Sequence, residues 1–212
     1  MVPSVAASLP PMDMPTLLAL AAALGWASGL RLYAVLFMAG WAGFAGWIDL
    51  PAGLQALQHP AMLWASGFMM LVEFCADKIP GLDSLWDLVH SVVRVPAGAA
   101  LGAAVFGVDH ATMAFVAALL GGSLAATSFA TKATTRAAVN TSPEPFSNFA
   151  LSLLEDGLVV GAFWLATHHP LVFGVALGIT LVLMVLLLVT LFKFLRAIVR
   201  RLRAWLHLTP AH

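Results

Sequence analysis

The chain has 212 residues, of which 61% are hydrophobic and 9% are charged, and its mean hydropathy is +0.95. This composition excludes an ordinary soluble domain, and the recurring apolar runs of about 18 or more residues indicate membrane-spanning helices and not a barrel. The formal net charge is zero, so nothing favours a nucleic-acid partner. The expected partners are the lipid bilayer and a small ion or solute, and the sequence leaves open whether copies of the chain form a homo-oligomer. The single cysteine, Cys75, excludes an internal disulfide.

Six apolar stretches predict an all-α, polytopic membrane protein that forms one domain over residues 1–212. In chain order they are residues 15–46, 61–79, 96–108, 111–130, 148–166 and 171–195. The first stretch is long for one straight span of about 20 residues, which predicts a tilt or a break near Gly29-Leu30-Arg31. The third is too short to span alone unless the segment before it, residues 82–94, continues into it. That segment is predicted to be an amphipathic helix that lies at the membrane interface or re-enters the protein.

The basic residues are distributed unevenly over the predicted loops. Nine of the ten lie in residues 78–95, 131–147 and 193–203, whereas the loops at 47–60, 109–110 and 167–170 contain none. Because Lys and Arg are retained on the cytoplasmic side, we expect a multi-pass protein of the bacterial inner (plasma) membrane. Both termini, including the basic tail 196–212, are then expected in the cytoplasm. The tenth basic residue, Arg31, lies inside the first span.

The two halves of the chain resemble each other weakly. LGWASGLRLY in the first span resembles LGGSLAATSF in the fourth, and the segments that follow Glu73 and Glu155 both reach a proline and then a small-residue apolar run. Because each half would hold three spans, an odd number, repeats over residues 16–108 and 111–200 would be inverted, a common transporter design. This predicts that Glu73 and Glu155 approach each other near mid-membrane.

The segment from residue 71 to residue 94 concentrates the polar chemistry. Helical spacing places Glu73 and Asp77 on one face. Steps of four, three and four place a second set on one stripe, namely Asp83, Asp87, His90 and Arg94. A carboxylate in the bilayer core costs at least about 2.5 kcal/mol, so it normally faces the bundle interior and marks an ion or proton path.

Clustered carboxylates with one imidazole suit either a proton or a divalent cation. The candidate ligands are Glu73, Asp77, Asp83, Asp87 and His90, with the first four as candidate metal ligands. A structural alternative is that Glu73 or Asp77 pairs with Arg31 or Lys78, and that the stripe ending at Arg94 is the wet face of an interfacial helix.

Two further groups of polar residues are candidate site residues. Glu155 and Asp156 lie in the fifth span, and since adjacent helical residues point about 100° apart, they are not expected to face the same neighbour. Both are candidates to bind the proton or cation, with Glu155 expected opposite Glu73 across the repeat and Asp156 expected to meet a cation. The loop before this span offers polar groups to an anion, with a helix cap at one of the last two: Asn140, Ser142, Ser147 and Asn148.

The sequence resembles a family of small bacterial inner-membrane proteins that is known only as a domain of unknown function. The resemblance is carried by two segments and covers residues 16 to about 200. The matching residues are Glu73, Ala76-Asp77-Lys78, Ile79-Pro80, Asp83, Trp86-Asp87, His90 and Arg94, then Asn140 to Pro145, Ser147-Asn148 and Glu155-Asp156. It implies a fold and a membrane location but no activity. A second similarity is to cation exchangers with a repeated Glu-x-Gly-Asp-Lys-Thr motif, from which this chain departs because Glu73 and Asp77 are four apart and Ala76 replaces the glycine.

These patterns favour a small secondary transporter or channel-like carrier that binds a proton or cation at the membrane-embedded carboxylates. One alternative is a membrane enzyme that acts on lipid head groups, with a metal held by Asp83, Asp87 and His90 at the cytoplasmic face. Another is a structural or assembly protein whose charges only join its helices. The sequence does not decide whether the protein is an enzyme, and a divalent cation is the one cofactor that it suggests.

Overall fold

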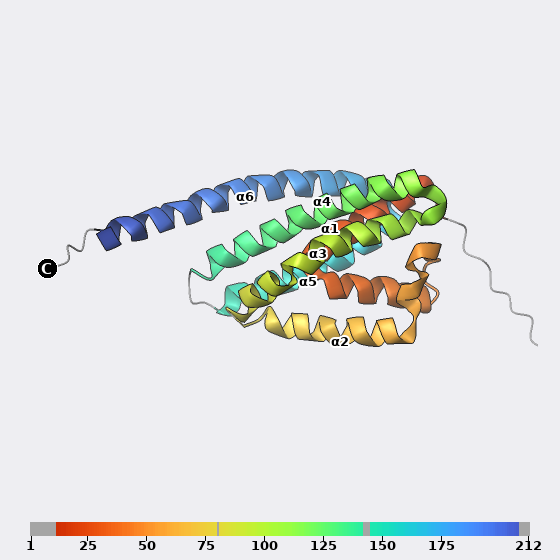
Figure 1. Ribbon diagram of the computed structural model, residues 1–212, viewed down its shortest axis with the longest axis horizontal. Coiled ribbons are helices and arrows are strands. Elements are labelled where there is room, and N and C mark those ends of the chain that lie inside the picture. Colours follow the sequence, from red (N-terminus) through yellow and green to blue (C-terminus); the bar gives the residue numbers. More distant parts are fainter. Residues whose placement is uncertain (1–11, 80, 142–144, 208–212) are drawn as a thin grey trace, which may run out of the picture.

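The computed structural model describes residues 12–79, 81–141 and 145–207, and these form helices with no strand. The predicted all-α, polytopic fold is therefore confirmed. The helices are α1 (Met14–Phe44), α2 (Pro60–Ala76), α3 (Leu82–Phe106), α4 (Ala111–Val139), α5 (Pro145–His168) and α6 (Pro170–His207), with short 3-10 helices η1 (Ala52–Gln58) and η2 (Val108–His110) (Figure 1). By length and composition, all of the α-helices except α2 could cross a membrane, and α2 is a shorter apolar helix.

The segment predicted as a separate amphipathic helix is the first half of α3. Residues 82–94 continue without interruption through Pro96 to Phe106. A proline in a helix removes one backbone hydrogen bond and often ends the helix, but neighbouring helices can hold such a kinked segment together. The short apolar stretch at 96–108 therefore spans as part of a 25-residue helix.

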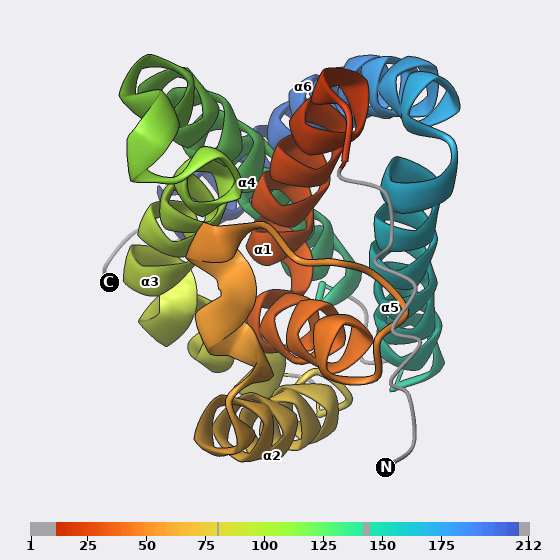
Figure 2. The same ribbon diagram turned by 90° about the vertical axis from the view of Figure 1, so that its right-hand side faces the viewer.

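Helix α1 is bent back on itself at Arg31, whose φ of −144° and ψ of 77° are not helical. The first limb, residues 14–30, follows α4, where Gly25 lies against Gly121. The second limb, residues 32–44, returns along α2, because Phe37 lies against Gly67 and Phe44 lies beside Pro60. The break predicted from the sequence is confirmed. In Figure 2 the start of the first limb and the end of the second limb are both on the side that faces the viewer.

This bend changes the expected number of crossings. Helices α2 to α6 run alternately in opposite directions, whereas both ends of α1 lie at the same end of the bundle (Figure 1). We call the end of the bundle where α2 ends, α3 begins and α6 ends the tail end, and the other the opposite end. Both Met14 and Phe44 lie at the opposite end. The described chain therefore begins and finishes at different ends of the bundle, contrary to the expectation from six full crossings.

The bend also makes the two halves that the sequence suggested as inverted repeats differ in their first helix. Helix α1 opens the first half with two limbs, but α4, which opens the second half, is a continuous helix of 29 residues. A rotation relating residues 16–108 to 111–200 would thus have to match a folded-back helix with an unbroken one.

Small residues let α1, α3 and α4 approach closely at the centre of the bundle. A Cβ added at Gly25 would overlap the backbone of Gly121, and one added at Gly121 would overlap the carbonyl oxygen of Gly98. Such small-residue contacts are characteristic of helices packed in membranes, where van der Waals contact replaces the hydrophobic effect as the force between helices. Helix α1 is consequently the most buried helix, and the others surround it (Figure 2).

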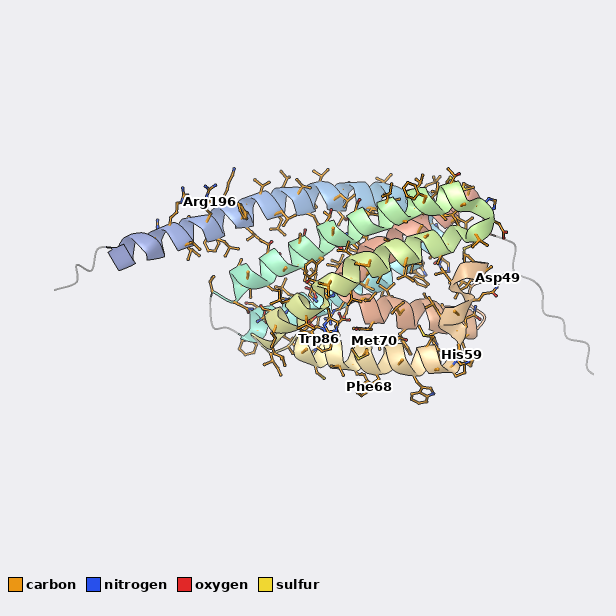
Figure 3. All side chains as sticks on the ribbon, in the orientation of Figure 1. Asp49, His59, Phe68, Met70, Trp86 and Arg196 are labelled. Carbon is orange, nitrogen blue, oxygen red and sulfur yellow. The ribbon has the colours of Figure 1, made fainter. Side chains whose placement is uncertain are left out.

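The outside of the bundle is apolar. Large hydrophobic side chains are exposed along the outer helices, and Phe68 projects outward from α2 (Figure 3). Helix α6 continues past the other helices at the tail end, where it carries Arg196 (Figures 1 and 3). An apolar exterior of this extent is expected of a protein surrounded by lipid and not by water.

Candidate functional site

The polar stripe of α3 faces the inside of the protein. Asp83, Asp87 and Arg94 are 0, 3 and 0% exposed, whereas Leu88 and Val92, on the other side of the helix, are 69 and 75% exposed. A helix at a water interface would expose its charges and bury its apolar face. The reverse orientation means that this stripe is not the wet face of an interfacial helix, and that its charges are part of the interior.

Two further buried cations come from α4 and were assigned to a loop in the sequence analysis. The predicted fourth span stopped near residue 130, but the helix continues to Val139 and buries both Lys132 and Arg136. Together with Ser128, they recur every four residues, which places all three on the face of α4 that looks inward. That spacing was a signal for these residues, but a criterion based on apolar runs ends at the first charge.

Ten charged side chains form one connected set of ion pairs, which we call the ionic network. Its cations are Arg31, Arg94, Lys132 and Arg136, and its carboxylates are Glu73, Asp77, Asp83, Asp87, Glu155 and Asp156. Lys132 lies seven residues before the end of α4, which is about 10 Å at 1.5 Å per residue. The network therefore lies inside the bundle, in the half nearer the tail end.

Asp77, at the end of α2, has three cationic partners, the same three as Glu155. Its Oδ2 atom lies 2.9 Å from Nη1 of Arg31, 2.9 Å from Nζ of Lys132 and 3.8 Å from Nη2 of Arg136. Its backbone carbonyl also accepts a hydrogen bond of 2.9 Å from Nη1 of Arg136. One carboxylate thus joins buried cations from α1 and α4, which need carboxylate partners in the interior.

The break in α1 is stabilised by the same cations. Ending the first limb leaves carbonyl groups without helical partners, and in an apolar interior each one must find a donor. Lys132 donates to the carbonyl of Leu30 at 3.1 Å, and Ser128 donates to that of Trp26 at 2.6 Å. A cation at the end of a helix also interacts favourably with the helix dipole. The charged residues are therefore part of what allows α1 to turn back.

Glu155 and Asp156 both contact Arg31, contrary to the expectation that adjacent residues face different neighbours. Nε of Arg31 lies 3.6 Å from Oε2 of Glu155 and 3.2 Å from Oδ1 of Asp156. The directions of the two Cα–Cβ bonds do diverge, but flexible side chains converge on a guanidinium placed between them. Glu155 also pairs with Lys132 at 3.3 Å and with Arg136 at 3.2 Å, while the carboxylate of Asp156 stays partly exposed.

Glu73 is paired by Arg94 and not by Arg31 or Lys78. Nη2 of Arg94 lies 2.7 Å from Oε1 of Glu73, and its Nη1 lies 2.7 Å from Oδ1 of Asp87. Glu73 has no second cation among the described residues. Asp87 lies 3.3 Å from Nζ of Lys132, and this contact joins the Arg94 pair to the rest of the network.

Polar groups continue from the network toward the tail end. Nη1 of Arg136 lies 3.8 Å from Asp83, Asn140 donates to both oxygens of Asp83 at 3.2 Å, and Asn148 donates to Asn140 at 2.8 Å. Two of the four residues expected to bind an anion thus serve a buried carboxylate. Ser147 is half-buried, and Ser142 lies outside the described residues. Neither Ser147 nor Asn148 begins α5, which starts at Pro145, as suits a residue with no backbone N–H to satisfy.

The carboxylates of the network outnumber its cations by six to four. Four carboxylate oxygens in it are buried without a hydrogen-bond donor among the described residues: Oε2 of Glu73, Oδ1 of Asp77 and both oxygens of Asp87, of which Oδ1 still forms ion pairs with Arg94 and Lys132. With all six carboxylates ionised, the network would carry two excess negative charges inside an apolar bundle, where an ionised carboxylate is costly. Such a set of groups favours uptake of a proton or a cation.

A family model described as a domain of unknown function (DUF4126) matches residues 18–190. The chain belongs to this family. No curated protein and no solved structure matched the chain in the corresponding comparisons. The region that matches DUF4126 contains the whole ionic network.

The other candidate residues of this DUF4126 protein lie at the edge of the network. His90 donates a hydrogen bond of 2.9 Å from Nδ1 to the carbonyl of Trp86, stacks on that indole, and meets the ring of Tyr33 edge-on. Lys78 follows α2, and its ammonium lies over the ring of Phe74. Burial first, and then the nearby guanidinium of Arg31, lower the pKa of Lys78.

The carboxylates do not group as ligands of one metal ion. Within the described part of this DUF4126 chain, no three His, Cys, Asp or Glu side chains are placed to hold a metal. Asp83, Asp87 and His90, which the lipid-enzyme interpretation would require around one ion, have separate partners in Asn140, Arg94 and Trp86.

A cavity reaches the network of this DUF4126 protein from the side. It has a volume of about 400 Å³ and lies between the second limb of α1, α2 and α5, with Arg31, Glu73 and Asp156 among its lining residues. A second cavity of about 390 Å³ continues along α1 and α5 toward the opposite end, and both are lined by Phe37, Met38 and Val160. Together they form a groove that leads from the opposite end to the charged residues.

Proposed function

We propose that this protein is a small membrane carrier that binds a proton or a cation at the ionic network. The excess of six carboxylates over four cations, buried inside an apolar bundle, is the observation that supports this proposal. Binding one positive charge would reduce the cost of that excess, and releasing it would restore the cost. A site whose excess negative charge falls when it is occupied suits a carrier that loads and unloads.

Glu73 is the group that we expect to take up the proton or cation. Its only cationic partner among the described residues is Arg94, which is shared with Asp87, and its second oxygen has no donor. It also lines the lateral cavity, so an ion that entered there would reach it. Asp77, in contrast, is surrounded by cations and serves to hold the helices in place.

Flux measurements on purified protein in lipid vesicles test this function. Glu73→Gln keeps the shape of the side chain and leaves Arg94 paired with Asp87, so we expect a folded protein that has lost its ion flux. The fluxes of protons, manganese, calcium and magnesium are measured beside thermal unfolding in detergent. Asp49→Asn, in the exposed loop after α1, is the matched control and should keep full flux. If Glu73→Gln unfolds the protein, or if the unmodified protein carries neither these ions nor an organic cation, the carrier function is wrong.

We further propose that the protein lies in the bacterial inner membrane with the tail end of the bundle in the cytoplasm. Lys78, Arg196, Arg200 and Arg201 lie toward this end, and the segments of the opposite end, residues 45–59 and 107–110, contain no Lys or Arg. Residues 1–13 contain none either. This charge bias supports a cytoplasmic C-terminus. Because α1 turns back, the same bias supports an N-terminus outside the cytoplasm, whereas six full crossings would have both termini in the cytoplasm.

Reporter fusions distinguish the two orientations. We expect a reporter after His212 to be cytoplasmic, and reporters at the N-terminus and at Gln55 to be both periplasmic. Alkaline phosphatase and green fluorescent protein fusions read the two sides in opposite ways. An N-terminal reporter found on the same side as the one after His212 would mean that α1 crosses the membrane in full.

A further inference from the structure

The groove between the second limb of α1 and α5 points to the substrate class of the carrier. We propose that this groove binds a hydrophobic organic cation, an ammonium or phosphonium that carries alkyl or aryl groups, with its charge placed near Asp156 and Glu73. This inference rests on the proposed function, since it names what occupies the same network from the side. The argument depends on the shape, the charge and the aromatic lining of the groove.

The groove is accessible from outside the bundle. Leu71, Trp164 and Val160 line it and are 60, 52 and 55% exposed. Its two cavities share Phe37 and Met38, so a molecule that entered beside Trp164 would move along one apolar surface. The combined volume is of the size that drug-like ligands occupy. A ligand on this route must itself be largely apolar.

The inner end of the groove carries net negative charge. Arg31 is the only cation among its lining residues, and it is shared by three carboxylates, those of Asp77, Glu155 and Asp156. The carboxylate of Asp156 is partly exposed although it pairs with Arg31, and Oε2 of fully buried Glu73 has no donor among the described residues, so both can interact with a ligand's positive charge. A cation placed there would compensate part of the excess negative charge of the network, whereas an anion would add to it.

The outer part of the groove is rich in aromatic side chains. Trp41, Trp47, Trp164 and Phe37 all line the cavity nearer the opposite end. Aromatic rings attract cations through their negative faces, most strongly when the cation is poorly hydrated, as organic ammonium and phosphonium ions are. An inorganic cation would have to lose its hydration shell to pass them. The lining therefore selects for an organic cation and gives it successive contacts on the way to Asp156.

Binding of tetraphenylphosphonium to the full-length protein in nanodiscs tests this inference. We expect saturable binding that Asp156→Asn weakens by about tenfold or more. Val160→Trp should also weaken it, because the indole would fill the place where the two cavities meet. Val182→Trp, on the exposed outer face of α6, is the matched control and should bind as the unmodified protein does. Triphenylphosphine oxide, a neutral molecule of similar shape, should bind poorly.

Three results would overturn the inference: no saturable binding, equal binding of the neutral analogue, or binding that neither variant changes. Equal binding of the neutral analogue would mean that the groove holds an acyl chain or another uncharged apolar group. The outcome is separable from the proposed function. If the phosphonium does not bind but flux that depends on Glu73 is measured, the proposed substrate class is wrong and the proposed carrier function is kept. If the phosphonium binds as expected but the unmodified protein carries no ion, the groove is a binding site for organic cations and the proposed carrier function is wrong.

Discussion

Asp77→Asn is expected to lower the free energy of unfolding by about 3–5 kcal/mol, because removing one partner of a buried ion pair leaves the others uncompensated. Asp77 lies within 2.9 Å of both Arg31 and Lys132, and all three side chains are almost fully buried. The neutral amide keeps the shape but not the charge. Arg31 would retain Glu155 at 3.6 Å and Asp156 at 3.2 Å, and Lys132 would retain Glu155 and Asp87 at 3.3 Å, all longer than the 2.9 Å contacts with Asp77. The bend of α1, which Lys132 helps to hold, should loosen as well.

The measurement is thermal and denaturant-induced unfolding in mild detergent. For a chain of this size, the loss corresponds to a fall in melting temperature of about 10 °C. Asp109→Asn makes the same chemical change at an exposed position in η2 and is expected to leave stability unchanged. If both variants have the same melting temperature, the ion pairs of Asp77 do not contribute to the stability of the folded protein.

The sequence predicts which residues share a face of a helix, but not whether that face contacts water, lipid or protein. The steps from Asp83 to Arg94 placed four polar residues on one stripe, and the structure confirms that they share a face. Whether that face meets water or protein depends on the surrounding medium. Because the same periodicity describes an interfacial helix and an inside-out membrane helix, it left both alternatives open. Only the positions of Lys132 and Arg136 decide between them, since these cations make the interior able to accept carboxylates.

The direction of α1 could not be predicted, although its break could. Hydropathy counts apolar residues and a span needs about 20 of them, so 31 residues indicate a helix that is too long without indicating where it goes. The turn at Arg31 depends on donors from elsewhere in the chain, chiefly Lys132 and Ser128. Those contacts join residues about a hundred positions apart, and no local pattern reveals them.

Ion-pair partners were equally beyond local reasoning. The sequence suggested Arg31 as a partner of Asp77, and the two side chains are indeed 2.9 Å apart. It offered no reason to join Glu73 to Arg94, because these residues lie on different helices and on opposite sides of the turn at Gly81. Pairing of this kind follows from how α2 and α3 pack on α1, which is a property of the assembled bundle.

The pair formed by Arg94 and Glu73 yields the sharpest test of how the network is balanced. Arg94→Met keeps much of the side-chain volume but leaves Glu73 with no cation among the described residues, so we expect a loss of about 3–5 kcal/mol in unfolding free energy. Glu73→Gln alone should cost less than about 1 kcal/mol, since Arg94 keeps Asp87 at 2.7 Å. Combining the two changes removes the stranded charge, and we expect the double variant to regain about 1–3 kcal/mol relative to Arg94→Met.

A double-mutant cycle of unfolding free energies, repeated over a range of pH, makes this measurement. If Glu73 is the group that accepts the proton, the loss caused by Arg94→Met should shrink as the pH falls, because a protonated carboxyl needs no cation beside it. The Glu73→Gln background should show no such dependence, since the amide does not titrate. Additive losses at every pH would contradict the coupling of these two residues. If the coupling is the same at every pH, Arg94 and Glu73 do form a stabilising ion pair, but another carboxylate accepts the proton. Asp87 is then the next residue to test.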